Sequence, residues 1–274
     1  MQLTGRVAVV TGAAGGLGSA IARRFAHEGA KVALCDIDEA AAERLAEEVS
    51  AAGGECVALR CDVSSSAAVD GAFAAVDARF GTVHILVNNA ARVPDTPADT
   101  VRRERHYGLL TQPLPRQSLG ITRDMSDEEW RRFWAVNVDG VFYCTRAALR
   151  RMETQRYGRI VNIASIAGIS AGSAHSPHYS ATKGAVVAFT RSVAAEVAGA
   201  NVLVNAIAPG GVETPAFKRF LDEIGPERRG QFMQLVPLGR LGRPEEYAAL
   251  ATHLASDECY LVGEIVNASG GVVI

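Results

Sequence analysis

The chain has 274 residues, of which 48% are apolar and 21% are charged, and its formal net charge at pH 7 is −2. This apolar content argues against a disordered chain, because burying it can offset the entropy cost of ordering. The near-neutral charge argues against a nucleic-acid partner, which would require a basic face. No apolar run reaches the roughly 18 residues of a membrane span, and no signal peptide is visible, so we expect a cytoplasmic protein.

The five cysteines are scattered along the chain, at Cys35, Cys56, Cys61, Cys144 and Cys259. An odd number of cysteines without a C-x-x-C pair is typical of free thiols in a reducing compartment. The chain also has no H-E-x-x-H motif, so the sequence predicts no metal site.

Strand-like and helix-like patterns alternate from the start of the chain. The run Val7–Thr11 is apolar and rich in β-branched residues. Leu17, Ile21 and Phe25 then recur every four residues, which predicts one face of a helix. Later segments repeat this alternation. The further predicted strands are Lys31–Cys35, Cys56–Leu59, Val83–Val87, Arg159–Ile163, Val202–Ile207 and Ile265–Val266.

Helices are predicted between these strands. Ser126 and Glu129 have the spacing of a capping box, which predicts the start of a long helix that reaches about Glu153. A later helix carries Tyr179, and Pro244 opens another at its first position.

This alternation predicts the fold class. Continuous apolar strands are typical of parallel strands that are buried on both faces. Because crossovers between parallel strands are right-handed, the connecting helices cover both faces of the sheet. We therefore expect an α/β fold: a single Rossmann-type domain over residues 1–274, with a doubly wound parallel sheet of about seven strands and helices on both faces.

One segment interrupts the alternation. Residues 92–124 show neither periodicity and hold four of the ten prolines, so we expect an inserted loop there. The loop would begin where the fourth strand ends, beside the carboxyl edge at which open α/β sheets bind ligands. It contains six arginines and four acidic residues. Two interpretations stay open: a lid that contacts a large or anionic substrate, or a solvated loop packed on a neighbouring subunit.

Glycines are concentrated between the first strand and the first helix, in Thr11-Gly12-Ala13-Ala14-Gly15-Gly16-Leu17-Gly18. Glycines allow the backbone to turn tightly and to approach a pyrophosphate, and a helix N-terminus offers unpaired N–H groups. At this place in the first βαβ unit, the motif favours a dinucleotide site over a plain turn.

Asp36 ends the second strand, 18 residues after Gly18. A carboxylate at this position can accept hydrogen bonds from a ribose diol and would repel a 2′-phosphate. No Lys or Arg lies between Gly12 and Gly18, and Ile37 follows Asp36. These features predict NAD as the cofactor and disfavour NADP. The alternative role for Asp36 is to cap the helix that begins near Asp38.

Tyr179 and Lys183 lie four residues apart in a predicted helix, so their side chains share one face. A free tyrosine has a pKa of about 10 and is a poor base at neutral pH, but a nearby ammonium lowers that pKa. By itself the pair is more typical of a core tyrosine beside a solvated lysine. Its spacing from Ser165 and from the glycine turn favours a catalytic pair.

Together these motifs resemble those of the short-chain dehydrogenase/reductase family, over nearly the whole chain apart from residues 92–124. The glycine turn matches the family's T-G-x-x-x-G-x-G. Asn88-Asn89-Ala90-Ala91 resembles its N-N-A-G, with Ala91 in place of the last glycine, and Pro209-Gly210-Gly211-Val212-Glu213-Thr214 matches its P-G-x-V-x-T. The residues that match its catalytic tetrad are Asn137, Ser165, Tyr179 and Lys183.

The resemblance implies a role for each of these residues. Tyr179 would be the general acid/base, and Ser165 would hold the substrate oxygen. Lys183 would bind the nicotinamide ribose, and Asn137 would anchor a water. The implied cofactor contacts are Gly12, Ala14, Gly16, Leu17, Gly18, Asp36, Ile37, Asp62, Val63, Asn89, Ala90, Ala91, Tyr179, Lys183, Pro209, Gly210, Val212 and Thr214.

The same resemblance implies an NAD-dependent oxidoreductase that interconverts a small secondary alcohol and a ketone by hydride transfer. Residues 126–165 also resemble the 3-oxoacyl-carrier-protein reductase branch, which usually uses NADPH, so a 3-oxoacyl-thioester reductase is the alternative. A non-catalytic dinucleotide-sensing protein is an alternative of another class. Family resemblance also suggests a homotetramer.

Two further segments border the expected site. Residues 216–237 are predicted to cover the substrate, with ordinary packing of a small helix as the alternative. The apolar candidates there are Phe217, Phe220, Leu221 and Phe232. His175 and His178 flank the start of the helix that carries Tyr179. Either could contact substrate, but we expect a helix-cap or surface role for each.

Overall fold

A computed structural model describes residues 1–113, 115 and 117–273, with the side chains of all of these except Ala216 and Phe220. Arg116, one of the six arginines of the 92–124 segment, and the Phe220 side chain lie outside the described residues. Within the described part of the chain, no helix is long and apolar enough to cross a membrane. All five cysteines are free thiols.

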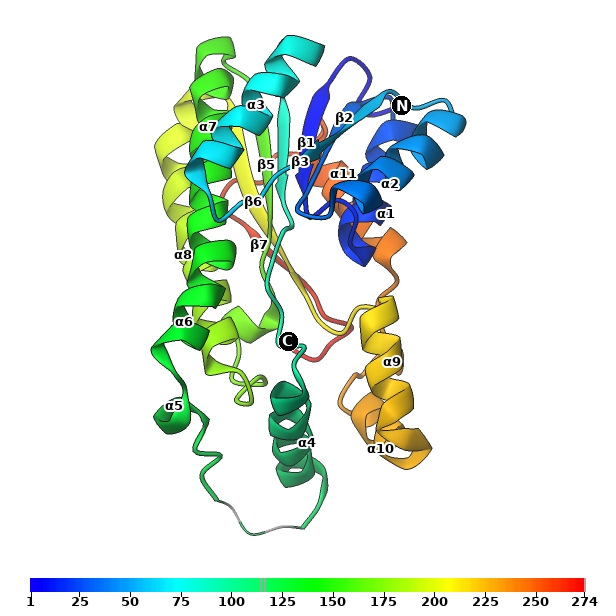
Figure 1. Cartoon of the computed structure of the whole chain (residues 1–274), viewed down its shortest axis with the longest axis vertical. Coiled ribbons are helices and arrows are strands. Elements are labelled where there is room, and N and C mark those ends of the chain that lie inside the picture. Colours follow the sequence, from blue (N-terminus) through cyan, green and yellow to red (C-terminus); the bar gives the residue numbers. More distant parts are fainter. Residues whose placement is uncertain (114, 116, 274) are drawn as a thin grey trace.

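Seven parallel strands form one sheet, in the order β3-β2-β1-β4-β5-β6-β7 (Figure 1). They are β1 Val7–Thr11, β2 Lys31–Asp36, β3 Cys56–Arg60, β4 Ile85–Asn88, β5 Gly158–Ile163, β6 Val202–Pro209 and β7 Ile265–Ala268. The chain winds outward from β1 to β3 and then from β4 to β7 in the opposite direction, which is the doubly wound topology. The predicted fold class is therefore confirmed.

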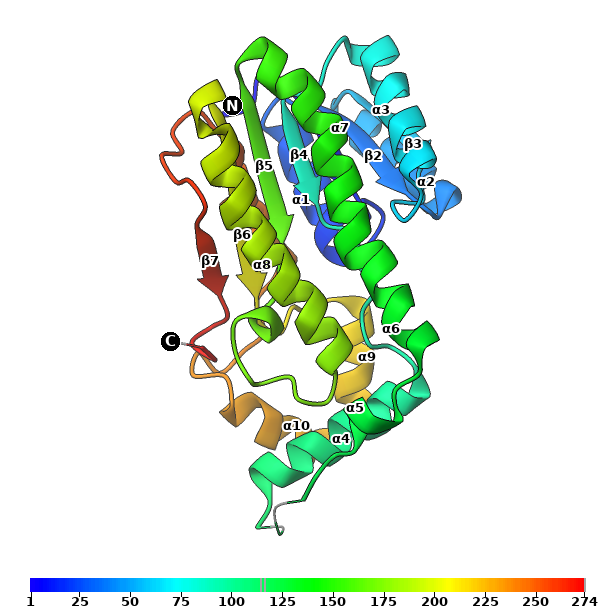
Figure 2. The same cartoon turned by 90° about the vertical axis from the view of Figure 1, so that its left-hand side faces the viewer.

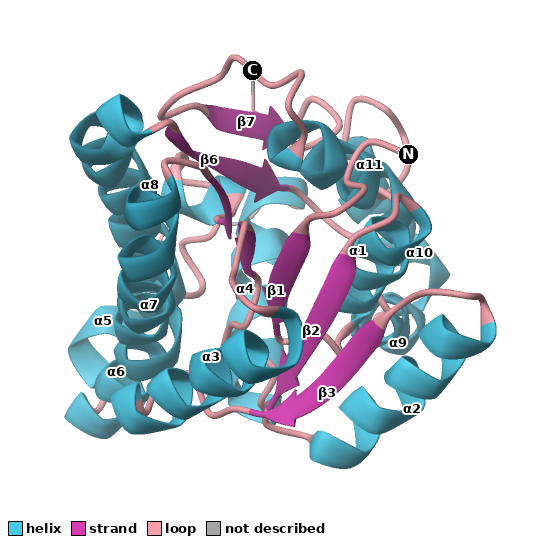
Figure 3. Cartoon of the chain, turned by 90° about the horizontal axis from the view of Figure 1, so that it is seen from above, coloured by secondary structure: helices cyan, strands magenta, loops and turns pink. Residues whose placement is uncertain are grey.

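Helices cover both faces of this sheet (Figure 3). On one face, Phe25 lies in a core formed with α1, α2 and α11, and on the other, Phe73 lies in a core formed with α3, α7 and α8. The six helices are α1 Gly16–His27, α2 Glu39–Ala51, α11 Pro244–Ala255, α3 Ser66–Phe80, α7 Gly140–Gln155 and α8 Pro177–Val197. The order of strands reverses between β1 and β4, and open α/β sheets bind their ligands in the crevice at the carboxyl ends of the two strands at such a reversal.

The described part of residues 92–124 contains helices, so the expectation of a loop without secondary structure is wrong there. They are α4 (Pro97–Thr111) and the short turn α5 (Ile121–Asp124). Both lie beyond the carboxyl edge of the sheet, where α9 (Pro215–Glu223) and α10 (Gly225–Gln234) also lie (Figures 1 and 2). Helices from two distant parts of the chain therefore border the crevice.

The start of α4 is held by a capping box. Thr96 Oγ1 accepts a hydrogen bond from Asp99 N (3.2 Å), and the Asp99 carboxylate accepts one from Thr96 N (3.1 Å). Pro97 takes the first helical position, where its missing N–H costs nothing. The buried residues of this helix are Asp99 and His106, which are polar. The sequence of α4 shows no apolar periodicity, because the residues that this helix buries are polar.

The long helix predicted after Ser126 is present but interrupted. α6 (Asp127–Trp134) passes through a π-helical turn, Ala135–Asp139, into α7. Ser126 Oγ accepts a hydrogen bond from Glu129 N (3.1 Å), as predicted. The Glu129 carboxylate instead accepts a hydrogen bond from Arg102 of α4 (2.6 Å), so only half of the predicted capping box forms.

Candidate functional site

The glycine turn joins β1 to α1 at the crevice. Gly12 has a φ of +60°, in the left-handed region that favours glycine, and a Cβ on Gly18 would collide with the Gly12 carbonyl oxygen. The N-cap of α1 is Gly15, which has no side chain to bond the N–H groups of the first turn. Those N–H groups are left available to a ligand. The turn therefore fits the pyrophosphate of a dinucleotide.

Asn89 holds the glycine turn in place. Its Nδ2 donates to the carbonyl oxygens of Thr11 (3.0 Å) and Gly12 (2.9 Å), and Ala90 N donates to Thr11 Oγ1 (3.1 Å). Ala91, which stands where the family motif has glycine, has no left-handed φ, so its methyl group brings no backbone strain. The Asn89–Ala91 segment thus lies directly beside the turn.

Asp36 also touches the glycine turn. Its Oδ2 accepts a hydrogen bond from Ala14 N (2.9 Å), and its Oδ1 accepts one from Asp38 N (3.0 Å). The cap of α2 is Asp38, whose side chain accepts from Ala41 N. The alternative role of Asp36 as the helix cap is therefore wrong. Ile37 beside it is 61% exposed, so its side chain lies at the surface next to this carboxylate.

Asp62 and Val63 have local structural contacts. Asp62 Oδ1 accepts hydrogen bonds from Ser64 N (3.0 Å) and Ser64 Oγ (2.7 Å). The Val63 side chain is buried against Gly140, where an added Cβ would lie 2.8 Å from Val63 Cγ2. The side chain of Val63 is thus a core residue, and only its backbone is left for a cofactor contact.

The segment after β6 meets the glycine turn from the other side. Gly210 N donates to Ala268 O (3.2 Å). Val212 forms an isolated parallel bridge with Gly242. The Thr214 methyl group lies so close to Gly16 that a Cβ there would be 3.0 Å from Thr214 Cγ2. Two segments predicted to contact the cofactor, almost 200 residues apart, are therefore adjacent in space.

Residues of the predicted tetrad are fixed near the carboxyl end of β5. Ser165 follows this strand, and its Oγ accepts a hydrogen bond from Ala167 N (3.1 Å). Lys183 is buried on α8, and its Nζ donates to Ile163 O (2.7 Å). Tyr179 lies one turn earlier on α8, close enough to Ser165 for that hydroxyl to lower the pKa of the tyrosine. The structure thus brings three of the four predicted residues together.

Asn137 lies in the π-helical turn, a type of distortion that is frequent at functional sites. Its Nδ2 donates to Thr182 Oγ1 (3.1 Å) and Arg92 O (3.0 Å), and its Oδ1 accepts from Arg92 N (2.7 Å). Thr182 and Arg92 connect Asn137 to α8 and to the 92–124 segment. Neither residue belongs to a motif, so the sequence does not indicate these two contacts.

Burial has the largest effect on the pKa values of Tyr179 and Lys183. It raises the pKa of Tyr179, while the Ser165 hydroxyl lowers that pKa. Burial also lowers the pKa of Lys183 to about 8. Lys183 Nζ is 5.8 Å from the centroid of the Tyr179 ring. The pKa of Tyr179 is therefore raised in this structure, contrary to the predicted lowering, and its cause is burial.

His175 and His178 are both buried, so the expected surface role is wrong for each. His175 Nδ1 lies 3.2 Å from Nδ1 of His106 on α4. The His178 ring packs edge-on against Phe133 with 4.0 Å between centroids, and neither of its nitrogens has a hydrogen-bond partner among the described residues. The helix that carries Tyr179 thus begins between two buried imidazoles.

A buried polar cluster surrounds His178. Ligand atoms of Asp99, Glu129 and His178 lie within 4.8 Å of one another, a spacing that could hold a metal ion. Arg102 already pairs with both carboxylates, at 3.3 Å from Asp99 and 2.6 Å from Glu129. The guanidinium supplies the positive charge that a metal would bring, so we interpret the cluster as an ion-pair network.

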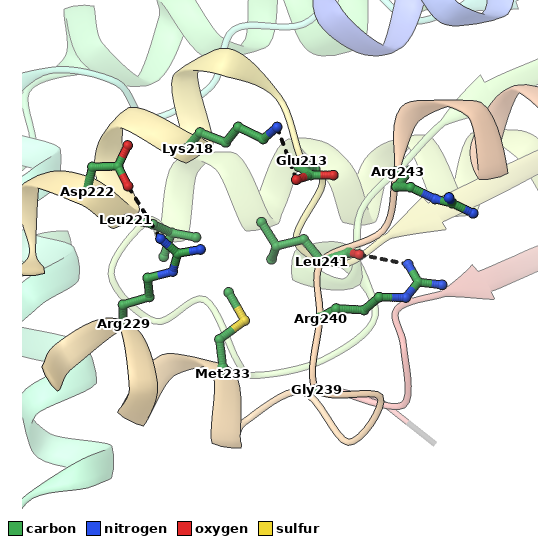
Figure 4. A pocket seen from close by; sticks show the side chains of 10 residues that line it. All are labelled: Glu213, Lys218, Leu221, Asp222, Arg229, Met233, Gly239, Arg240, Leu241 and Arg243. Atoms are coloured by element: carbon green, nitrogen blue, oxygen red, sulfur yellow. Dashed lines mark hydrogen bonds and ion pairs between the residues drawn. The ribbon is translucent and has the colours of Figure 1, made fainter. Parts of the chain in front are cut away.

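Two cavities lie beyond the carboxyl edge of the sheet. One, of about 620 Å³, lies between α9, α10 and residues 239–243, and its side chains point toward one another in Figure 4. Its cations are paired with carboxylates, for example Lys218 with Glu213 and Arg229 with Asp222. The other, of about 370 Å³, lies between α4 and α10 and includes Tyr107 and Phe232.

The profile of the short chain dehydrogenase family matches residues 6–224. The chain belongs to the short-chain dehydrogenase family. It is 34% identical to a 3-oxoacyl-acyl-carrier-protein reductase of Thermotoga maritima over 281 aligned positions that cover 100% of both chains. It is 35% identical to the BbsD subunit of (2S)-[(R)-hydroxy(phenyl)methyl]succinyl-CoA dehydrogenase of Thauera aromatica, covering 99% of this chain and 98% of that one.

A solved structure agrees with this assignment. The crystal structure of a putative gluconate dehydrogenase from Agrobacterium tumefaciens superposes with a TM-score of 0.86 at 30% identity, covering 100% of this chain and 98% of the other. This short-chain dehydrogenase is therefore an oxidoreductase of CH–OH and keto groups that uses a nicotinamide dinucleotide. The predicted family and its resemblance to 3-oxoacyl reductases are confirmed.

Proposed function

We propose that this short-chain dehydrogenase interconverts a secondary alcohol and a ketone, with Tyr179 as general acid/base and NAD as the preferred cofactor. The observation that carries the proposal is the placement of Ser165 just after β5, with Tyr179 and Lys183 one turn apart on α8 and Lys183 Nζ fixed to Ile163 O (2.7 Å). The bound nicotinamide ring would supply or accept the hydride.

The residues of the chain divide the remaining work. In ketone reduction, the Tyr179 hydroxyl donates its proton to the carbonyl oxygen, and in alcohol oxidation the phenolate takes the proton back. Ser165 donates a hydrogen bond to the same substrate oxygen and stabilises its developing charge. Lys183 binds the nicotinamide ribose, and Asn137 anchors a water near Lys183. The remaining predicted cofactor contacts, from Gly12 to Thr214, keep the roles that the family resemblance implies.

Asp36 supports the preference for NAD. Each of its oxygens accepts one backbone N–H, which leaves lone pairs for the hydroxyl groups of a ribose. Its charge would repel a 2′-phosphate. Arg60 lies in register with Asp36 on the neighbouring strand, and its positive charge would attract a 2′-phosphate. The ratio of NAD to NADP activity therefore tests whether Asp36 sets the cofactor preference.

The test compares kcat/KM for NAD and NADP in wild type and in Asp36→Asn, which removes the charge but keeps a side-chain oxygen for Ala14 N. We expect wild type to prefer NAD and the variant to shift the ratio toward NADP by about tenfold or more, the size of one lost charge–charge repulsion. Asp38→Asn, at the neighbouring cap, is the control and leaves the ratio unchanged. A wild-type enzyme that prefers NADP would contradict this part of the proposal.

A 3-oxoacyl thioester is the second candidate substrate, because relatives that match the whole chain carry that name. Acetoacetyl-CoA with NADH and with NADPH, beside a panel of secondary alcohols with NAD and NADP, separates the two substrate classes. Dinucleotide binding without turnover of any member of the panel would instead favour the non-catalytic alternative.

We further propose one catalytic domain over the whole chain, which works as a homotetramer in the cytoplasm. The free cysteines support a reducing compartment. Trp130 on α6 and Phe142 on α7 are large apolar side chains that are 39% and 43% exposed, which supports association through these helices. Light scattering of the purified chain measures its oligomeric state.

A further inference from the structure

The first turn of α8 is not held by a cap of its own. Ser176 takes the N-cap position, but its side chain makes no capping hydrogen bond, and Pro177 follows at the first helical position. Tyr179 lies in this turn. Its placement therefore depends on the contacts that neighbouring segments make with the start of the helix.

One such contact is the pair His106–His175. The two Nδ1 atoms are 3.2 Å apart and both side chains are buried, which is the geometry of an imidazole–imidazole hydrogen bond. One ring donates its Nδ1–H and the other accepts it. Tyr107 packs on His106 and His175 with ring centroids 5.5 and 5.6 Å away, and on Phe232 at 5.2 Å. Tyr107 of α4 therefore packs on both rings of the pair, and Phe232 of α10 packs on Tyr107.

A second contact lies on the other side of the same turn. His178 Nε2 is 3.8 Å from Glu129 Oε1, and Glu129 pairs with Arg102 of α4. Arg102 also pairs with Asp99, whose side chain closes the capping box of α4. Helix α4 therefore reaches the start of α8 at His175 and, through Arg102 and Glu129, at His178.

We propose that His106 is a positioning residue for Tyr179, acting through His175, and that α4 is a fixed wall of the active site. This differs from both interpretations of the 92–124 segment that the sequence left open, a lid and a solvated loop. The inference rests on the proposed function, because it takes Tyr179 as the acid/base.

The effect of His106 is on turnover rather than on cofactor binding. Reacting groups must lie within a few tenths of an ångström of their productive positions, and a 1 Å misplacement can cost about 100-fold in rate. The glycine turn is held by Asn89, and Lys183 is held by Ile163 O, so neither depends on α4. Loss of the His106 hydrogen bond should therefore lower kcat and leave the dissociation constant of the dinucleotide nearly unchanged.

Three variants separate this role from simple packing. His106→Phe keeps a ring against Tyr107 but removes the Nδ1 atom, and His106→Asn keeps a polar atom close to the Nδ1 position. Val101→Ala changes an exposed residue of the same helix and is the control. We measure amide hydrogen exchange over residues 177–183, the dissociation constant of NADH by its fluorescence, and kcat with acetoacetyl-CoA or the most active carbonyl compound of the panel.

We expect His106→Phe to speed exchange over residues 177–183 by about tenfold or more and to lower kcat by about 10- to 100-fold. His106→Asn should restore at least part of both, and Val101→Ala should match wild type. Unchanged exchange and kcat in His106→Phe would overturn the proposal, as would equal losses in the Phe and Asn variants. Full activity of Tyr179→Phe would instead overturn the proposed function, whatever the exchange shows.

Discussion

At the glycine turn, closely packed neighbouring atoms decide which residue can occupy a position. Gly18 faces the Gly12 carbonyl and the Asn89 amide so closely that no side chain fits. Asn89 holds the turn in place, because its Nδ2 donates to two carbonyl oxygens of the turn. A change at Gly18 therefore has to move the backbone that would bind the pyrophosphate.

Replacing Gly18 with alanine should cost about 1–3 kcal/mol of folding free energy, the usual cost of overpacking, and weaken dinucleotide binding by at least tenfold. Gly71→Ala is the matched control, because Gly71 lies within α3 and an added Cβ there meets nothing within 4 Å. That variant should gain up to about 1 kcal/mol from helix propensity. Urea unfolding and NADH fluorescence measure both effects, and normal binding in Gly18→Ala would contradict this account of the turn.

Elements with apolar faces were predictable from the sequence, and the element with a polar face was not. β1 is buried along its whole length and appears in the sequence as one apolar run. α4 buries Asp99 and His106, so periodicity could not reveal it. Thr96-Pro97-Ala98-Asp99, an N-cap residue followed by proline and an acidic third residue, is the signal that could have predicted its start.

Contacts between distant elements could not be predicted from the sequence, for a different reason. His106 and His175 are 69 residues apart, and nothing in either segment indicates the other. The sequence indicates the four tetrad residues because they match motifs of the family. Thr182 and Arg92, which hold Asn137, belong to none.

The packing of α4 against the start of α8 makes stability depend on pH. The pKa of His175 is lowered to about 3, mainly by burial and also by Arg103, His106 and His178, while Asp99 acts in the opposite direction. Because the folded state keeps this imidazole neutral, its contribution to stability is fully present above about pH 6.5 and is lost as the pH falls toward about 3. At pH 5 the loss amounts to roughly 2 kcal/mol for one excluded proton.

His175→Asn should therefore show a smaller drop in the free energy of unfolding between pH 7 and pH 5 than wild type. Urea unfolding at the two pH values measures this difference. His27→Asn is the control, because His27 lies at the end of α1, away from α4 and α8. An equal drop in wild type and in His175→Asn would show that His175 titrates as it does in the unfolded chain.

At the scale of the whole molecule, the doubly wound sheet directs every predicted functional segment to one edge. The glycine turn, the Asn89 segment, Ser165 and Thr214 all follow strands, and parallel strands end on the same side. α4, α9 and α10 border that edge from distant parts of the chain (Figure 1). The sheet positions the chemistry, and these three helices shape the space in which a substrate would lie.

The proposed proton exchange between Tyr179 and the substrate oxygen is tested most directly by the kcat of Tyr179→Phe with the best substrate of the panel. General acid/base catalysis typically contributes about 10²–10⁴-fold, so kcat should fall by that factor while NADH affinity changes by less than about twofold. Tyr157→Phe, which removes the hydroxyl that donates to Asp257 outside the tetrad, should keep its kcat. A Tyr179→Phe enzyme with wild-type kcat would contradict the account.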